Sequence, residues 1–111
     1  MSAPLGTAHL SDDEFLAAFD SLTLDPGSFR HADHLRLAWL LLRRCSPAEA
    51  ETRLLDGIAR FAARAGAPQK FSQPLTLAWL RLVSAANPAS AADFASWIDA
   101  HPCLLDKSLA S

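Results

Sequence analysis

Helix-start signals recur along this chain, and a proline or a glycine follows the segments that they open. Ser11 precedes Glu14 by three residues, the spacing of a capping box, in which each side chain satisfies a backbone donor of the first turn. Ser46 is followed by Pro47 and Glu49, which predicts a second box with proline at the first helical position. Strand-like alternation of apolar and polar residues is absent throughout, so the pattern predicts helices.

These signals predict four helices and a fifth, over residues 11–22, 30–44, 46–66, 72–86 and 90–101, with one more short turn in the tail. The fourth begins near Ser72 and the fifth at Ser90 with Asp93. Alanine and leucine dominate the composition, and both lose little freedom in a helix. We therefore expect an all-α, compact bundle of four to five helices that forms one domain over residues 1–111, with residues 1–10 as a flexible N-terminal segment. The predicted core comprises Phe15, Phe19, Leu35, Trp39, Leu42, Ile58, Phe61, Trp79 and Trp97.

Charge and hydropathy exclude some classes of function. Ten basic and twelve acidic side chains give a net charge of −2, which disfavours nucleic-acid binding because no basic excess or dense basic stripe is present. The longest apolar stretch, residues 37–42, is far too short to span a bilayer, and the start of the chain does not resemble a signal peptide. Cys45 and Cys103 have no metal-like spacing and read as reduced thiols. We expect a cytoplasmic protein with no membrane contact.

Two histidines, three residues apart, open the most apolar predicted helix, in the stretch FRHADHLRLAW at residues 29–39. At about 100° per residue, His31 falls at the centre of the apolar arc and His34 on its flank. The opposite, polar side of this helix carries Arg30, Asp33, Arg36, Arg43 and Arg44. A buried imidazole is tolerated only when its ring nitrogens have partners, so something polar must meet both rings.

Two interpretations of the histidine pair are open. In the first, the rings pack and bond to backbone carbonyls or to a carboxylate in the loop before the helix. In the second, they hold a ligand or a divalent metal, although a metal site needs at least three protein ligands. Asp20 and Asp25 are plausible carboxylate partners by chain proximity. Two interpretations are also open for the arginines of the polar side: they form a solvated face, or they bind a carboxylate or a phosphate.

Three segments of the chain resemble a family of small bacterial helical proteins. They are FRHADHLRLAWLLL, GAPQKFSQPLTLAWLRLV and HPCLLDKSLAS, against family patterns of F-x-H-x-x-H-L-x-x-A-W, K-Y-H-E-T-x-T-x-A-W and N-P-x-L-L-D-K-S-L. The match covers most of the chain from Phe29 onward. The resemblance implies a pocket in which two histidines of the first pattern meet a later histidine and glutamate, a set suited to a divalent metal or to acid/base chemistry.

The chain departs from the second family pattern at four positions. Phe71 replaces its tyrosine, Ser72 its histidine, Gln73 its glutamate and Pro74 its first threonine, while Thr76 is kept. Serine and glutamine are poor metal ligands, but they still donate and accept hydrogen bonds. Ser72 is also a good helix cap, which gives the change a structural explanation.

The sequence names no reaction, and whether the chain is an enzyme stays open. Our functional hypothesis is a polar pocket for a small ligand or a metal, lined by His31 and His34 and faced by Ser72, Gln73 and Thr76. The metal version assigns His31 and His34 as its ligands. The alternative is a non-catalytic interaction or accessory protein, either a homodimer or the subunit of a partner protein, because Trp39, Leu40 and Leu41 extend the apolar surface round the second predicted helix.

Overall fold

The computed structural model describes residues 10–24 and 29–106, which form five α-helices and three short 3₁₀ turns. No strand occurs in these two ranges, so the predicted all-α bundle is confirmed. Residues 1–9, most of the segment predicted to be flexible, lie outside the described residues. The α-helices are α1 (Asp12–Asp20), α2 (His31–Arg44), α3 (Pro47–Arg64), α4 (Gln73–Ala85) and α5 (Phe94–Ala100), and the 3₁₀ turns are η3 (Pro68–Lys70), η4 (Pro88–Ser90) and η5 (Pro102–Leu105).

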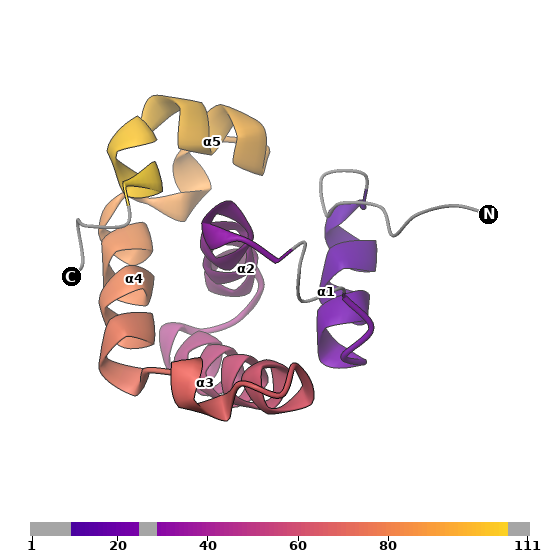
Figure 1. Ribbon diagram of the computed structural model, residues 1–111. Helices are drawn as coiled ribbons and strands as arrows, with labels where there is room; N and C mark the ends of the chain where they lie inside the picture. The colour runs from indigo at the N-terminus through magenta and orange to yellow at the C-terminus, as the bar shows by residue number, and fades with distance from the viewer. Residues whose placement is uncertain (1–9, 25–28, 107–111) are drawn as a thin grey trace.

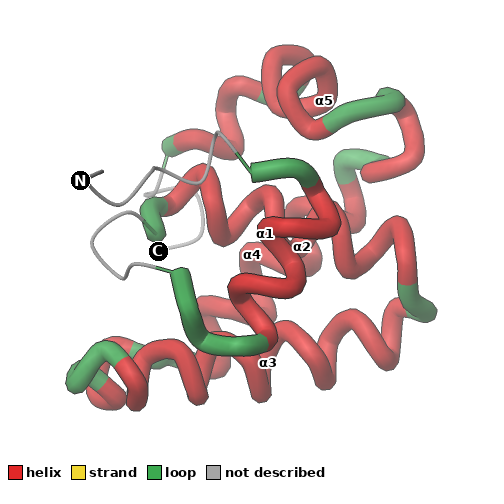
Figure 2. Tube along the Cα trace, turned by 90° about the vertical axis from the view of Figure 1, so that its right-hand side faces the viewer, coloured by secondary structure: helices red, strands yellow, loops and turns green. Residues whose placement is uncertain are grey.

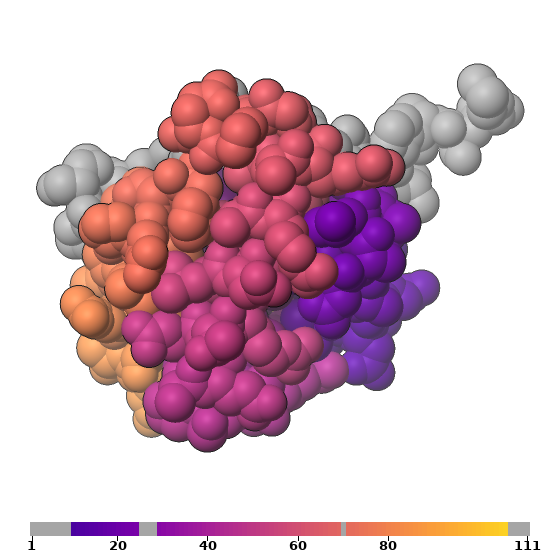
Figure 3. Space-filling view, turned by 90° about the horizontal axis from the view of Figure 1, so that it is seen from below, coloured from indigo at the N-terminus to yellow at the C-terminus, as the bar shows by residue number. Residues whose placement is uncertain are grey.

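Helix α2 occupies the middle of the bundle. In Figure 1 it is seen nearly end-on, with α1, α3, α4 and α5 arranged around it. It contacts α3, α4, η4 and η5 along its length. Figure 2, turned by a quarter, shows the long α3 running beneath the other helices, and Figure 3 shows its outer face between α4 and α1. None of the described helices is long and apolar enough to cross a membrane.

The central position of α2 explains its excess of apolar residues. Elements of this same chain bury Trp39, Leu40 and Leu41, and each of these side chains is at most 2% exposed. A broad apolar surface on a helix is expected to be covered, and here the bundle itself supplies the cover. The surface predicted on these three residues for a partner is therefore used inside the fold.

The helix starts differ in detail from those predicted. The box of Ser11 and Glu14 is complete, with both reciprocal hydrogen bonds present. At α3, the Ser46 hydroxyl accepts from the Glu49 amide at 3.2 Å, but the Glu49 side chain does not return the bond, so the predicted second box is only half made. Asp93 rather than Ser90 caps α5, because Ser90 belongs to the preceding turn η4.

A group of four stacked rings, which we call the phenylalanine cluster, fills the space between α1, α2 and α3. Its members are Phe15, Phe19, Phe29 and Phe61, with ring centroids 4.7–6.3 Å apart. All four are buried. The backbone of α3 approaches the ring of Phe19 at Gly57, where an added Cβ would lie 2.4 Å from a ring carbon. The sequence pattern predicted three of these rings as core and missed Phe29.

Four further predictions about burial need correction. Asp33 and Arg36 do not lie on a solvated face, because Asp33 is buried and Arg36 is covered where it pairs with α1. Asp33 is 9% exposed, and the Arg36 guanidinium donates to Asp12 at 2.9 Å and lies 4.5 Å above the ring of Phe15. Conversely, two residues predicted as core, Leu42 and Trp79, are only partly buried and pack against the core from its edge.

Candidate functional site

A cavity of about 880 Å³ lies where the first turns of α2 and α4 approach α3 and η5, and we call it the interhelical cavity. A volume of this size is typical of small-molecule sites. Helix α2 contributes Arg30, His31, Ala32, His34 and Ala38 to its wall, and α3 contributes Leu54 and Ile58. The remaining lining residues described are Phe29, Phe71, Ser72, Leu75, Thr76, Trp79 and Leu105.

His31 combines a structural contact with a place in the cavity wall. Its Nε2 lies 2.9 Å from the carbonyl oxygen of Leu104, and its ring meets the edge of Trp79 with centroids 4.4 Å apart. Because a carbonyl can only accept, Nε2 carries the proton of this bond, and Nδ1 is the acceptor of the neutral ring. In the described part of the chain, Nδ1 has no hydrogen-bond partner.

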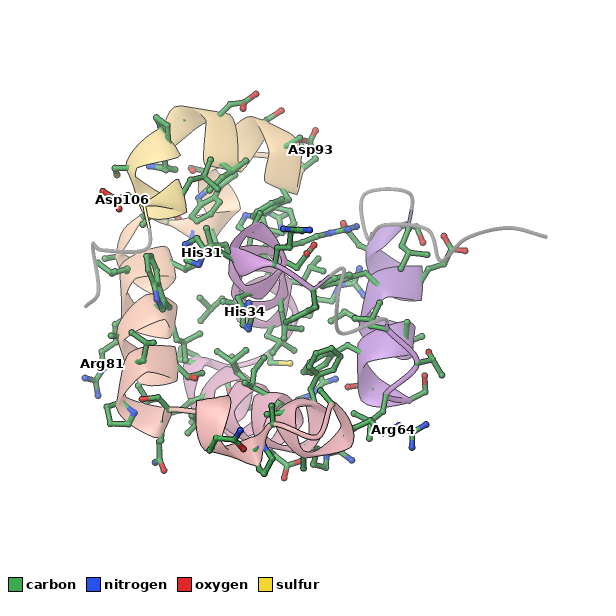
Figure 4. All side chains as sticks on the ribbon, in the orientation of Figure 1. His31, His34, Arg64, Arg81, Asp93 and Asp106 are labelled. Carbon is green, nitrogen blue, oxygen red and sulfur yellow. The ribbon has the colours of Figure 1, made fainter. Side chains whose placement is uncertain are left out.

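His34 lies one helical turn further along α2, as Figure 4 shows for the two labelled imidazoles. Its Nδ1–H donates to the carbonyl oxygen of Arg30 at 3.0 Å, and its ring meets Phe29 at 4.5 Å in an edge-on contact. This partner is the carbonyl directly before the helix, as the packing interpretation predicts. The partner of His31 instead comes from η5, which no sequence signal indicated. Both rings therefore pack through hydrogen bonds to the backbone and also line the cavity.

Helix α4 supplies the opposite wall through one face. Ser72, Leu75, Thr76 and Trp79 follow the i, i+3, i+4, i+7 spacing that places residues on one side of a helix. The Ser72 hydroxyl accepts from the Leu75 amide at 3.3 Å, and the Thr76 hydroxyl donates to the Ser72 carbonyl at 2.8 Å. Both hydroxyls keep capacity for a further hydrogen bond.

Gln73 is the candidate residue that the structure does not bring to the cavity. It is exposed and is not among the lining residues. One residue further along the chain is roughly 100° further round a helix axis. This rotation turns Gln73 away from the face that carries Ser72 and Thr76. The expectation that Gln73 faces the two histidines is therefore wrong, and the helical spacing of its neighbours was the available signal.

The described residues of the cavity wall carry charge of one sign only. Arg30, His31 and His34 are the ionisable side chains among the described lining residues, and no aspartate or glutamate belongs to that set. Arg30 is the N-cap residue of α2, and its guanidinium makes no ion pair within the described chain. Helical spacing predicted Arg30 on the polar side of the helix, outside the pocket.

Two exposed leucines border the cavity. Leu75 and Leu105, at 42% and 48% exposed, are the large hydrophobic residues of the described chain that stand out from its surface. Both belong to the cavity wall. An apolar side chain at a rim gains from contact with an apolar ligand because that contact removes its surface from water.

The metal interpretation finds little support in the arrangement of side chains. No group of three or more His, Cys, Asp or Glu residues that could hold a metal ion occurs in the described residues. Of the two carboxylates suggested by chain proximity, Asp20 accepts from Arg53 at 3.4 Å, and Asp25 lies outside the described ranges. Arg53 also donates to Cys45 Sγ at 3.2 Å, a bond that raises the pKa of the guanidinium.

A search for relatives of this chain matches no known protein-family model, no curated protein and no solved structure. The resemblance to the family of small bacterial helical proteins consequently stays a prediction.

Proposed function

We propose that this chain is a small-molecule-binding protein whose site is the interhelical cavity. The observation that carries the proposal is a hollow of about 880 Å³ in a small bundle, walled by two imidazoles and two hydroxyls. Convergent polar groups on an otherwise apolar wall are typical of ligand sites.

The division of the wall suggests how a ligand would lie. Leu54, Ile58 and Trp79 offer an apolar surface for its body, whereas His31, Ser72 and Thr76 offer hydrogen bonds to its polar end. Holding a ligand requires no reaction. If chemistry occurs here, an imidazole is the group whose ordinary pKa suits acid/base work near neutral pH.

Calorimetric titration with phenylbutanol, a neutral probe with an apolar body and one hydroxyl, tests the proposal. We expect saturable binding to the unaltered chain and its loss in Ala32→Trp, where an indole placed on the cavity wall occupies the space. Ala63→Trp is the matched control, because Ala63 is also an exposed residue within a helix but lies outside the lining set. Binding that is absent, or that survives Ala32→Trp unchanged, contradicts the proposal.

The second candidate is a protein-interaction module, as a homodimer or as the subunit of a partner. The exposed Leu75 and Leu105 favour it, because paired apolar side chains at a surface are common anchors of interfaces. Light scattering tests self-association. A dimer that Leu75→Ser converts to a monomer favours the interaction module, and a monomer at all concentrations counts against the homodimer.

The metal version of the site and the cytoplasmic location both stay predictions. Elemental analysis of untagged protein tests the metal version. Close to one equivalent of metal that disappears in His31→Ala would support it, and less than a tenth of an equivalent would remove it.

A further inference from the structure

We infer that the interhelical cavity selects ligands in which an apolar body carries a carboxylate group. This inference rests on the proposed function, since it assumes that the cavity binds a ligand, and it adds the chemical class of that ligand. The chain as a whole has a net charge of −2, so a preference for anions does not follow from overall charge. It follows from the distribution of charge around this one cavity.

The first observation is that no described residue of the wall carries a negative charge. Its ionisable groups in the described residues are one guanidinium and two imidazoles. The described carboxylates nearest in sequence to the lining residues, Asp33 and Asp106, are not part of the wall, and Asp33 accepts from the Arg30 amide at 2.8 Å. A cationic ligand would meet Arg30 without a compensating carboxylate, whereas an anionic ligand would meet a positive partner.

The second observation is the state of Arg30. Arg36, Arg44, Arg53 and Arg60 are each ion-paired to an aspartate. Among the described residues, Arg30, Arg43, Arg64 and Arg81 make no ion pair, and of these four Arg30 alone lines the interhelical cavity. The Arg30 guanidinium has no such partner within the described residues, yet it stands at the cavity wall. Its planar donors match the geometry of a carboxylate, which they can bind through two parallel hydrogen bonds.

The backbone adds to this preference. Two helix N-termini border the same hollow. At α2 the lining residues are the N-cap Arg30 with His31 and Ala32, and at α4 they are the N-cap Ser72 with Leu75 and Thr76. Each N-terminus carries a partial positive charge from the aligned peptide dipoles. At α2 the Asp33 carboxylate, which accepts from the Arg30 amide at 2.8 Å, offsets this partial charge, whereas the first turn of α4 carries no acidic residue. The N-terminus of α4 therefore acts in the same direction as the charge of Arg30.

The apolar part of the wall sets the other half of the ligand. Leu54 and Ile58 of α3 face Trp79 of α4 across the cavity, and the exposed Leu75 and Leu105 border it. A small inorganic anion would leave this surface in contact with water. An aromatic or branched aliphatic carboxylic acid covers it and gains from the burial of apolar area.

Three probes that share one body and differ in charge separate these contributions. They are phenylbutyrate, phenylbutanol and phenylbutylamine, each titrated calorimetrically at low salt against the full chain. We expect phenylbutyrate to bind about fivefold more tightly than phenylbutanol, and phenylbutylamine more weakly than phenylbutanol, a modest ratio because Arg30 is exposed to solvent. Raising the salt concentration should reduce the preference for phenylbutyrate.

Arg30→Gln tests whether the preference arises at the cavity, and Arg81→Gln is its matched control. Both changes remove one positive charge from an exposed position, but Arg81 lies on the side of α4 that points away from α2 (Figure 4) and lines no part of the cavity. We expect Arg30→Gln to bring the affinities for phenylbutyrate and phenylbutanol to within twofold of each other. Arg81→Gln should leave their ratio unchanged.

The outcomes distinguish this inference from the proposed function. Equal affinities for phenylbutyrate and phenylbutanol, or an equal effect of the two arginine substitutions, would overturn the selection for carboxylates and leave the binding site standing. Failure of all three probes to bind would overturn the proposed function and this inference with it.

Discussion

The two flanks of α2 differ in how their space is filled. Toward α1, the phenylalanine cluster closes the gap with four stacked rings, and Arg36 seals its edge through an ion pair to Asp12. Toward α4, the wall carries Ala32 and Ala38 in place of large side chains, and the interhelical cavity remains. Phe29 borders both regions, so the dense flank and the hollow flank share one residue.

The comparison shows what each flank is built to do. The dense flank uses aromatic contacts and the close approach of the α3 backbone at Gly57, a combination that tolerates little change in volume. On the hollow flank, each imidazole donates a hydrogen bond to a backbone carbonyl, His31 to that of Leu104 and His34 to that of Arg30. These bonds fix the orientations of the rings without filling the space between the helices. Stability is therefore concentrated in the first region, and recognition is proposed for the second.

The largest expected difference concerns the removal of one large side chain from each flank. Phe19→Ala should cost about 3–5 kcal/mol of unfolding free energy, because Phe19 is 2% exposed and stacks on two other rings. Leu75→Ala should cost less than about 1 kcal/mol, since that side chain is already 42% exposed. Urea denaturation measures both values, and similar losses for the two variants would contradict the division.

Gly57→Ala probes the tightness of the dense flank by addition instead of removal. The new methyl group would overlap the ring of Phe19, which neighbouring rings hold in place, so we expect a loss of about 1–3 kcal/mol. Phe19→Leu removes the ring atoms that the new methyl group would overlap. The double variant should therefore lose less unfolding free energy than the sum of the losses of the two single variants. Strict additivity would show that the two residues do not touch as described.

His31→Ala tests how the hollow flank is held together. The loss of the bond to Leu104 and of the contact with Trp79 should lower stability by about 1–2 kcal/mol. The more specific effect is faster amide hydrogen exchange at residues 103–106, because the bond from His31 to Leu104 holds η5 against α2. His34→Ala is the control, since its described bond to Arg30 stays within α2 and its effect on η5 should be small.

The smallest effect is expected from the cap of α5, away from both flanks. The Ser96 amide donates a hydrogen bond of 2.7 Å to the Asp93 carboxylate. This bond lowers the pKa of Asp93 below its ordinary value of 3.8. A lowered pKa stabilises the fold above the ordinary value, and this contribution is lost as the pH falls through the lower, folded-state pKa. Melting temperatures between neutral pH and pH 2 should therefore fall less in Asp93→Asn, which keeps the cap without the titration. An identical pH dependence would contradict this role.

Local signals in the sequence predicted much of the fold. Chemistry within a few residues explains the helix caps at Ser11, Ser46 and Ser72. It also explains the end of α3 near Gly66, whose φ of +76° suits glycine. Local signals did not predict the cover over Arg36, because it depends on α1 packing against that side of α2, a long-range arrangement that periodicity within one helix cannot report.

The candidate site was predictable to the same extent. The inward turn of His31 and the positions of Ser72 and Thr76 follow from helical spacing, and the same spacing excludes Gln73. The bond from His31 to the Leu104 carbonyl joins residues 73 positions apart and required the fold. Arg30 was assigned to the polar face because a helical wheel gives the direction of a side chain and says nothing about which neighbouring helix leaves space beside it.

The indole N–H signals of Trp79 and Trp97, followed by nuclear magnetic resonance during addition of phenylbutyrate, test the central claim most directly. Trp79 lines the interhelical cavity, whereas the buried Trp97 donates its indole N–H to the carbonyls of Ala86 and Asn87. A ligand in the cavity should shift the Trp79 signal in a saturable manner and leave the Trp97 signal in place. An unmoved Trp79 signal, or equal shifts of both, would contradict the existence of a binding site between α2 and α4.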